Sequence, residues 1–357
     1  MSSCIVSMTR VADVKPHPDA ERLDVCTILG WQVVVQKGSM KSGDLVVYFP
    51  PSTILPEKWI EHWGIRKYLA GSEANRIHQV KLRGEPSFGF ATSVPEGLVA
   101  NEGDNVAEWF GAIKYEIPLD KLPQDATQKH PYWTKYTEIE NMRNFPDVFV
   151  EGETVAVREK IHGFNTYIGR IFEADGTVTD FASSHDTQRA KPETEEEMKK
   201  NFFWYAWTIP GMSEMIDKID KDLGDQSGSR LVEVFGEIFG SHVQSLTYGC
   251  GENELRFAVF DIRVKGKYLD NDILEKYLAE FNIPIAPLVY RGPFSLAKIR
   301  ELSEGVTVIG GGCHIREGVV VKPLTERNHT TVGRVVLKYI SDSYLFSKHA
   351  AQDKADV

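Results

Sequence analysis

The sequence predicts an α+β protein in which a small β-barrel precedes a larger part that mixes strands and helices. Two observations carry this prediction. Short runs of β-branched and aromatic residues, separated by glycine turns, dominate about the first 110 residues. From Val148 onward, similar runs alternate with longer polar and helix-like stretches. A chain of 357 residues is long enough for two domains of ordinary size.

The composition is typical of a protein with buried cores. Apolar residues make up 42% of the chain and charged residues 26%, and no apolar run approaches the roughly 20 residues that a membrane span needs. The N-terminus lacks the basic and apolar regions of a signal peptide. The four cysteines form no CxxC pair, so we expect no zinc site, no disulfide framework and a cytoplasmic or other reducing compartment.

The net charge of -10 excludes a protein that coats nucleic acid by bulk positive charge. It leaves room for a local basic groove. Residues 33–35 and 45–49 are β-rich runs, and glycines lie between them. About five such strands fit an OB-fold barrel, which we place at residues 1–112 as a nucleic-acid-binding domain. Residues 113–146, rich in Pro, Asp, Lys and Tyr, are predicted to form a linker and entry segment.

In the second part, residues 147–357, we predict strands and intervening polar segments. The charge-dense residues 193–200 are predicted to begin a solvated helix, and residues 220–230 to form a surface loop. The predicted strands cover residues 154–159, 231–234, 255–264, 318–322 and 335–339.

The motif KIHGFN at residues 160–165 carries the sharpest chemical signal. A lysine at a strand end, followed by a glycine turn, presents its amine over a cleft, and an uncharged lysine is a good covalent nucleophile. On its own the motif also fits an ordinary surface lysine before a turn. An ordered set of downstream segments favours the chemical interpretation. They are FGEIFG with Glu237, FAVFDI with Phe260, EGVVVKP with Glu317 and Lys322, and RVVLK with Lys338.

Each segment alone has a simpler explanation. Glu237 could cap a helix, Phe260 could belong to the core, and Glu317 could pair with Lys322. Together, in this order, they resemble the nucleotidyltransferase motifs of covalent ATP-dependent polynucleotide ligases over about residues 138–345. The segment at 159–165 is similar to the RNA ligase 2 family, because DNA ligases and capping guanylyltransferases usually carry Asp where His162 stands.

The resemblance implies a covalent nucleotidyltransferase (adenylyltransferase) domain built on antiparallel sheets with flanking helices. It implies an enzyme, an ATP-dependent RNA ligase that joins 3′-OH and 5′-phosphate RNA ends through lysyl-AMP and adenylated 5′-end intermediates. Lys160 would be the nucleophile, and Lys322 and Lys338 would contact the phosphates. The resemblance places Phe260 on the adenine and Glu159 at the base or ribose edge.

Physical chemistry agrees with this scheme. A free lysine has a pKa of about 10.4, so only about 0.1% of it is neutral near physiological pH. A nearby Lys338 and a divalent metal both disfavour the ammonium form. Glu237 and Glu317 are oxygen ligands suited to Mg²⁺ or Mn²⁺, held through water. ATP and one of these metals are therefore the expected cofactors.

The resemblance also implies contacts to the RNA ends. His162 and Asn165 would serve the steps after adenylation, and Arg158 is a candidate phosphate contact. The family carries a Ser-Arg pair about twenty residues after the lysine. Here the arginine is replaced by His185, or its role passes to Arg189, and the sequence leaves both open.

The N-terminal part has its own resemblance. Residues 14–26 are similar to the opening of tRNA-binding OB-folds of some aminoacyl-tRNA synthetases, and KLRG at 81–84 is similar to a loop in the OB-type ends of RNA ligases. Arg83 is either an RNA phosphate contact or a solvated turn residue, and His17 fits a turn. Four cations could form a basic face of the barrel: Lys37, Lys41, Lys81 and Arg83.

The chain ends shortly after Lys338, so we expect no C-terminal OB-fold or helical domain. An N-terminal OB-fold before a bare nucleotidyltransferase domain is similar to the RNA ligase 5 type, known from Deinococcus and Naegleria. We expect a monomer that acts on RNA, in a nicked duplex, and not at a membrane. Two alternatives remain open: a DNA ligase or capping-type nucleotidyltransferase, and a non-catalytic tRNA- or RNA-binding protein with a ligase-like fold.

Overall fold

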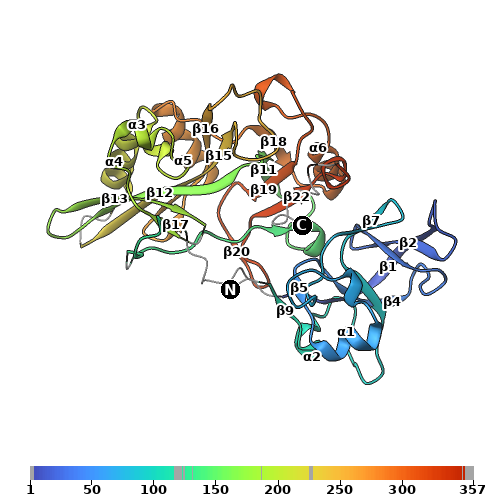
Figure 1. The fold of residues 1–357 in the computed structure, drawn as a ribbon. Coiled ribbons are helices and arrows are strands. Elements are labelled where there is room, and N and C mark those ends of the chain that lie inside the picture. Colours follow the sequence, from blue (N-terminus) through green and yellow to red (C-terminus); the bar gives the residue numbers. More distant parts are fainter. Residues whose placement is uncertain are drawn as a thin grey trace. The chain divides into compact units, whose positions relative to one another are not determined.

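Figure 1 shows the computed structural model, which describes residues 4–115, 123, 125–130, 132–185, 187–224, 228–347 and 349. The chain divides into two compact units, with the boundary between Leu119 and Asp120. No helix within the described residues is long and apolar enough to cross a membrane.

The first unit is built around a five-stranded antiparallel sheet in the order β3-β2-β1-β4-β8. Gln32 O accepts a 2.8 Å hydrogen bond from Phe88 N, which brings the start of the last strand back beside β3 and curls the sheet. The strands are β1 (Ser7–Pro16), β2 (Leu23–Ile28), β3 (Trp31–Gln36), β4 (Leu45–Phe49) and β8 (Phe90–Ser93).

Shorter elements complete this unit. His17 Nε2 lies 2.9 Å from Leu82 O and ties the β1–β2 turn to a hairpin whose tip carries the exposed Arg83 at φ +52°. The buried side chains of Met8, Phe49 and Phe110 share one core. The elements are β5 (Thr53–Ile54), α1 (Glu57–Trp63), the 3-10 helix η1 (Arg66–Tyr68), β6 (Val80–Leu82), β7 (Glu85–Ser87), α2 (Ala107–Phe110) and β9 (Ile113–Lys114).

The second unit contains two larger sheets. A six-stranded antiparallel sheet has the order β14-β13-β12-β15-β16-β17, and a five-stranded sheet has the order β10-β22-β19-β11-β18. The six-stranded sheet consists of β12 (Phe164–Phe172), β13 (Val178–Ser184), β14 (Gln188–Arg189), β15 (Arg230–Gly240), β16 (Leu255–Val264) and β17 (Lys267–Tyr268). The five-stranded sheet consists of β10 (Glu140–Asn141), β11 (Thr154–Lys160), β18 (Leu288–Pro293), β19 (Gly318–Pro323) and β22 (Leu337–Ile340).

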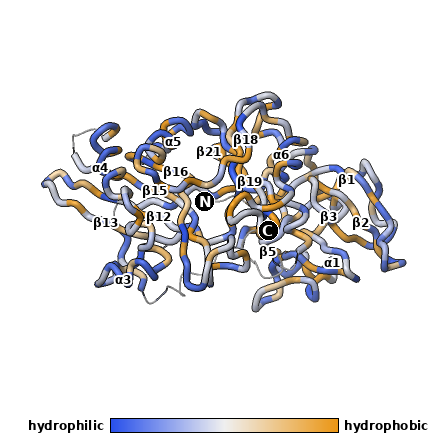
Figure 2. Tube along the Cα trace, turned by 90° about the horizontal axis from the view of Figure 1, so that it is seen from above, coloured by the Kyte–Doolittle hydropathy of each residue, from blue (hydrophilic) through white to orange (hydrophobic). Residues whose placement is uncertain are grey.

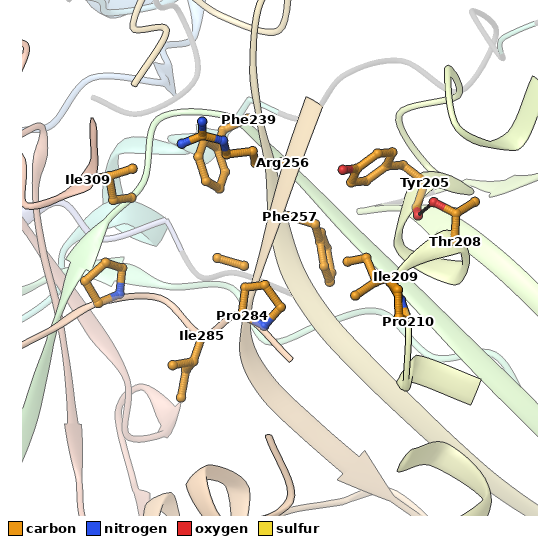
Figure 3. A pocket seen from close by; sticks show the side chains of 12 residues that line it. Tyr205, Thr208, Ile209, Pro210, Phe239, Arg256, Phe257, Pro284, Ile285 and Ile309 are labelled. Atoms are coloured by element: carbon orange, nitrogen blue, oxygen red, sulfur yellow. Dashed lines mark hydrogen bonds between the residues drawn. The ribbon is translucent and has the colours of Figure 1, made fainter. Parts of the chain in front are cut away.

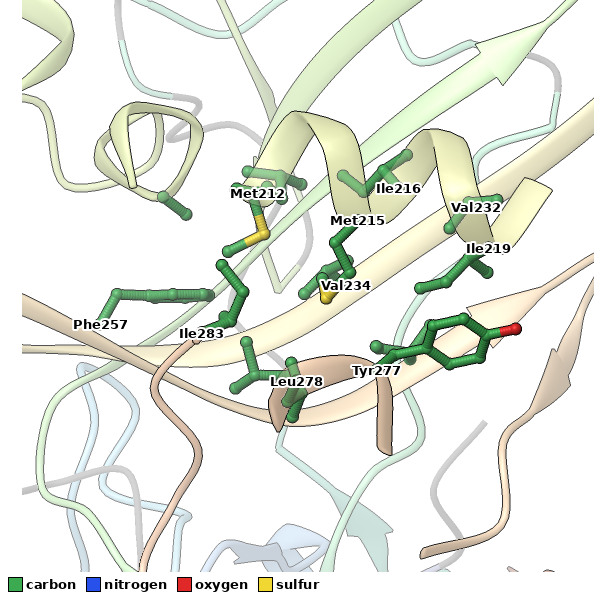
Figure 4. Packing of buried hydrophobic residues seen from close by; sticks show 14 of the residues in the cluster. Met212, Met215, Ile216, Ile219, Val232, Val234, Phe257, Tyr277, Leu278 and Ile283 are labelled. Carbon is green, nitrogen blue, oxygen red and sulfur yellow. The ribbon is translucent and has the colours of Figure 1, made fainter. Parts of the chain in front are cut away.

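Helices cover one face of the six-stranded sheet. Met212, Met215, Ile216 and Ile219 follow the helical spacing of one apolar stripe, and they pack with residues of β15 such as Val234 (Figure 4). In Figure 2 hydrophobic residues gather along strands such as β19, whereas hydrophilic residues dominate α3. The remaining elements are η3 (Met142–Asn144), α3 (Glu195–Met198), η4 (Tyr205–Thr208), α4 (Met212–Leu223), α5 (Asn271–Glu280), α6 (Leu296–Ser303), η5 (Ile309–Gly311), β20 (Asn328–His329), β21 (Gly333–Arg334) and α7 (Asp342–Leu345).

Two details differ from the sequence prediction. The strand predicted at 231–234 extends to Gly240, so Glu237 lies inside β15 rather than after it. Part of the predicted linker belongs to the second unit, because Tyr136 packs with Tyr167 and Phe235 on the other face of the six-stranded sheet. Strand β10 of the same segment pairs in parallel with β22. The entry segment is held there by burial, which a composition rich in Pro and Asp does not indicate.

Between the sheets lies a buried ionic cluster centred on Asp261. Two guanidinium nitrogens of Arg334 each lie 2.9 Å from a different Asp261 oxygen, and Tyr136 Oη donates a 2.5 Å hydrogen bond. Lys322 also pairs with Asp261. Burial alone raises the pKa of Asp261, but Arg334 and Lys322 outweigh it and lower this pKa to about 2. The carboxylate is therefore ionised and joins β16, β19 and β21.

Replacing Asp261 with Asn should leave the charges of Lys322 and Arg334 buried without their main partner. We expect D261N to lower the free energy of unfolding by about 3–5 kcal/mol, measured by urea unfolding. The matched control is D180N, because Asp180 forms a 2.7 Å ion pair with Arg170 at a more exposed site, and should cost less than about 1 kcal/mol. Equal losses in the two variants would contradict this account of the cluster.

Candidate active site

Lys160 ends strand β11, and the neighbouring strand brings a carboxylate to it. In the antiparallel register of β11 and β19, Lys160 lies opposite Gly318, the residue after Glu317. Lys160 Nζ lies 2.6 Å from Glu317 Oε1, and the Lys160 side chain is 15% exposed while that of Glu317 is 0% exposed. The amine therefore stays accessible to solvent at a fixed position.

Gly163 permits the turn that follows. A Cβ at this position would lie 2.1 Å from Ile238 O, so only glycine lets the turn approach β15 so closely. As a result, Gly163 N donates a 3.1 Å hydrogen bond to Glu237 Oε1. This contact thus brings together the KIHGFN motif and Glu237, both of which the sequence indicated.

His162 is buried behind the lysine. Its backbone N–H donates a 2.5 Å hydrogen bond to Tyr248 Oη, and its ring Nδ1 lies 3.4 Å from Glu317 Oε2. Tyr344 Oη also lies 3.4 Å from Nδ1. Burial and the Glu317 charge raise the pKa of Tyr248 well above its ordinary value, so its hydroxyl stays neutral.

The Glu317 carboxylate fits a cation. Both of its oxygens are buried, and neither accepts a hydrogen bond of good geometry, although Lys160 and His162 stand at ion-pair distance. A buried carboxylate in this state is stabilised by a nearby positive charge. Within the described residues no group of three or more His, Cys, Asp or Glu converges on a metal position. A divalent ion would therefore keep several water or phosphate ligands, as Mg²⁺ usually does.

Strand register places Lys338 on the same face of the five-stranded sheet as Lys160. Lys160 pairs with Gly318, Lys338 pairs with Val320, and directly opposed residues of antiparallel strands share a face. Lys322 shares this face, but it is buried and pairs with Asp261 and Glu326. The structure therefore brings Lys338, but not Lys322, to the end of the sheet that carries Lys160.

The end of the six-stranded sheet gathers other predicted residues. Asn165 lies opposite Glu237, and Asn165 Oδ1 is buried without a hydrogen-bond partner. The β12–β13 register ends with Thr166 opposite Ser184, so the next step along both strands leads to Asn165 and His185. Arg189 is engaged elsewhere, because Nη1 lies 2.5 Å from Asp125 Oδ1. Phe260 is half-buried and packs against Tyr136 at 5.3 Å between ring centroids.

Two residues do not have the surroundings that we expected. Glu159 points to the opposite face of β11 from Lys160, where its carboxylate is bonded by the Thr307 hydroxyl and by Val308 N at 2.8 Å. It anchors the loop before β19 and is not presented to a base. Arg158 donates a 2.6 Å hydrogen bond to Ala286 O and pairs with Glu275, so its guanidinium is held inside the protein. Strand alternation decides the direction of Glu159, and tertiary partners that the motif does not show hold both side chains.

The structure also adds residues that the motifs did not indicate. Tyr248 and Ser245 come from the loop after β15, and Tyr344 and His349 come from α7 and the residues after it. All four lie far in sequence from His162, and no local pattern marks them. Only the folded chain could identify them.

An apolar cavity of about 340 Å³ lies near this region (Figure 3). It is lined by residues such as Tyr205, Phe257 and Ile285, and by none of the predicted site residues. It adjoins the site through Pro287, whose carbonyl accepts the N–H of Glu159 at 2.9 Å. The charged chemistry therefore lies outside the cavity.

Comparison with known families now decides the membership of the chain. An RNA ligase family model matches residues 153–340, which is more than half of the 357 residues. The chain belongs to the RNA ligase family. A second model, of an OB-fold domain, matches residues 5–94. The predicted architecture of this RNA ligase family member, an OB-fold followed by a nucleotidyltransferase domain, is confirmed.

Solved structures share this fold over nearly the whole chain. A variant of the Naegleria gruberi RNA ligase with AMP and Mn has a TM-score of 0.71 at 22% identity, covering 96% of this chain and 98% of that one. The Naegleria gruberi RNA ligase with PPi has a TM-score of 0.68 at 21% identity, with the same coverage. No curated protein matches the chain significantly in sequence.

Tyr248 should support this ligase fold at His162. The variant Y248F removes the hydroxyl that accepts the His162 N–H and leaves this buried donor unsatisfied, so we expect a loss of about 1–3 kcal/mol in the free energy of unfolding. Urea unfolding would measure it. The control is Y290F, whose hydroxyl donates to Pro293 O at an exposed site and should matter little. No difference between the variants would contradict the role of Tyr248.

Proposed function

We propose that this protein is an ATP-dependent RNA ligase that joins 3′-OH and 5′-phosphate RNA ends. The observation that carries the proposal is the Lys160 amine, held 2.6 Å from the buried Glu317 at a strand end within the matched family segment. Structures with the same fold support ATP as the nucleotide substrate, because Naegleria gruberi RNA ligase structures contain ATP, AMP or PPi, several of them with Mn.

In the first step, Lys160 Nζ attacks the α-phosphorus of ATP. A P–N bond forms, the bond between the α-phosphorus and the oxygen bridging to the β-phosphate breaks, pyrophosphate leaves, and the amine loses its proton. The product is lysyl-AMP. An oxygen of the RNA 5′-phosphate then attacks the phosphorus of lysyl-AMP, the P–N bond breaks, and the Lys160 amine takes up a proton. The 3′-OH attacks the phosphorus of the RNA 5′-phosphate and loses its proton, and AMP leaves as its P–O bond to that phosphorus breaks. Lys338, on the same sheet face, is the proposed phosphate contact.

Before the attack, the Lys160 ammonium group must lose one proton to become a neutral amine. The Glu317 pair positions the amine but favours its ammonium form. Glu317 and Glu237 would hold Mg²⁺ or Mn²⁺, which supplies positive charge against the phosphates and competes with the ammonium for the carboxylate. The unsatisfied oxygens of Glu317 support this assignment. We exclude the side chains of Glu159, Arg158 and Lys322 from the proposed ligand contacts because they are bonded within the protein.

The RNA ends would meet the end of the six-stranded sheet. His162, Asn165 and His185 remain the proposed contacts, and the pairing of Arg189 with Asp125 favours His185 over Arg189 for the 5′-phosphate. Phe260 remains the proposed adenine partner. In the OB-fold unit the side chains of Lys37, Lys41, Lys81 and Arg83 are exposed, as an RNA backbone contact requires. We propose a nicked duplex as substrate and a monomer as the active form.

A covalent adduct tests the enzyme proposal. Wild-type protein incubated with α-labelled ATP and Mg²⁺ or Mn²⁺ should acquire label, and K160A should acquire none, because the nucleophilic amine is gone. Denaturing gel electrophoresis would detect the label. K338A, expected to lose a phosphate contact, should be labelled slowly rather than not at all. No label on the wild type with either metal would favour the non-catalytic alternative.

A choice of nicks tests the substrate. Nicked duplexes with RNA at both ends, DNA at both ends, and a 3′-OH RNA joined to a 5′-phosphate DNA would be sealed in parallel with ATP and Mn²⁺. We expect faster sealing of the nick with RNA at both ends than of the all-DNA nick, because the family match is to RNA ligases. The mixed nick would show whether RNA is needed at the 5′-phosphate end. Sealing of all-DNA nicks alone would favour the DNA ligase alternative.

A further inference from the structure

A chain of polar contacts runs from Lys160 away from the active site. Lys160 Nζ lies 2.6 Å from Glu317 Oε1, and Glu317 Oε2 lies 3.4 Å from His162 Nδ1. His162 Nε2 lies 3.2 Å from Ser245 Oγ, which in turn lies 3.1 Å from His349 Nδ1. Ser245 and His349 belong to no motif identified above, and His349 lies beyond the matched residues 153–340.

The hydrogen-bonding capacity of the groups supports this chain of contacts. A hydroxyl group can donate one hydrogen bond and accept another, so Ser245 can bond His162 and His349 at the same time. On the other side of the ring, Nδ1 contacts the Tyr344 hydroxyl at 3.4 Å and lies at ion-pair distance from Glu317 Oε2. The ring of His162 is therefore held between two hydroxyl groups, with its Nδ1 edge beside Glu317.

The loop after β15 therefore holds His162 at two points. Tyr248 Oη accepts from the backbone N–H, and Ser245, three residues earlier, contacts the ring. His162 is only 2% exposed, so water cannot replace the hydroxyl at Nε2 easily. Without Ser245 the ring would lose its hydrogen-bond partner at Nε2 and would turn more freely, and such a turn would move Nδ1 away from Glu317.

We propose that Ser245 and His349 are positioning residues that hold the ring of His162 against Glu317, and so keep the Glu317 carboxylate beside Lys160. The inference rests on the proposed function, since its consequence is the rate of lysyl-AMP formation. Neither residue contacts Lys160 in this chain of contacts; both act through His162.

The test measures single-turnover labelling of the full-length protein with α-labelled ATP and Mn²⁺. S245A and H349A should each lower the maximal rate of adduct formation by about 5- to 30-fold. The ATP concentration at half-maximal rate should change by less than about 2-fold, because neither side chain is placed at the nucleotide. A role in ATP binding would instead raise this concentration.

Conservative variants separate positioning from simple support of the fold. S245T keeps a hydroxyl and H349N places an amide N–H near the position of Nδ1–H, so both should stay within about 3-fold of wild type. The double variant S245A/H349A should be no more than about 2-fold slower than S245A, because one chain of contacts is broken once. T247A and H242N, exposed residues of the same loop, are matched controls and should equal wild type.

The outcomes distinguish the two proposals. If wild-type protein forms no adduct, the proposed function fails. If wild type forms the adduct and S245A and H349A match it, the positioning role is wrong. It is also wrong if S245T and H349N are as slow as the alanine variants while all variants unfold at the wild-type urea midpoint. Additive losses in the double variant would show two independent effects and would overturn the single chain.

Discussion

The antiparallel register between β11 and β19 is the constraint on which the active site depends. It places Lys160 beside the start of β19 and so puts Glu317 within 2.6 Å of the amine. A shift of one residue would turn Lys160 to the opposite face of the sheet. The same register also orients Lys338 through β22. Backbone pairing, rather than flexible loops, thus positions the proposed nucleophile Lys160, Glu317 and the proposed phosphate contact Lys338.

Buried charges in the second unit fall into two kinds. Asp261 is surrounded by Arg334, Lys322 and a tyrosine hydroxyl, so its charge is compensated within the fold. Glu317 is equally buried, but its oxygens accept no well-formed hydrogen bond. A fully compensated carboxylate holds strands together, whereas an under-compensated one has free energy to gain from an incoming cation. This difference distinguishes Asp261, which supports the fold, from Glu317, which is proposed to take part in the reaction.

Neighbouring residues of the motifs show which predictions from the sequence agree with the structure and which do not. The order of the motifs predicted Lys160, Glu237, Glu317 and Lys338 as site residues. The structure brings the first, third and fourth of these to the adjoining strands β11, β19 and β22 or their ends, and it joins Glu237 of β15 to the lysine motif through Gly163 N. Glu159 and Arg158 belong to the same motif, yet both side chains are bonded within the protein. Lys322 was expected at the phosphates and is paired with Asp261. A motif specifies residue types and order, but partners 61 to 149 residues away in the sequence decide how the side chains of Lys322, Arg158 and Glu159 are bonded.

By itself, the sequence determined the two-part α+β architecture and indicated Lys160 as the proposed nucleophile. These features can be read directly from one sequence, because they depend only on neighbouring residues or on residue order. They are the strand periodicity, the Lys160–Gly163 turn and the order of the acids and lysines. Only the tertiary structure decided the surroundings of His162. Tyr248, Ser245 and Tyr344 contact it from two distant segments, and His349 contacts Ser245. Loop and helix packing, not sequence spacing, sets these positions. Contacts of this kind leave no local pattern in a sequence.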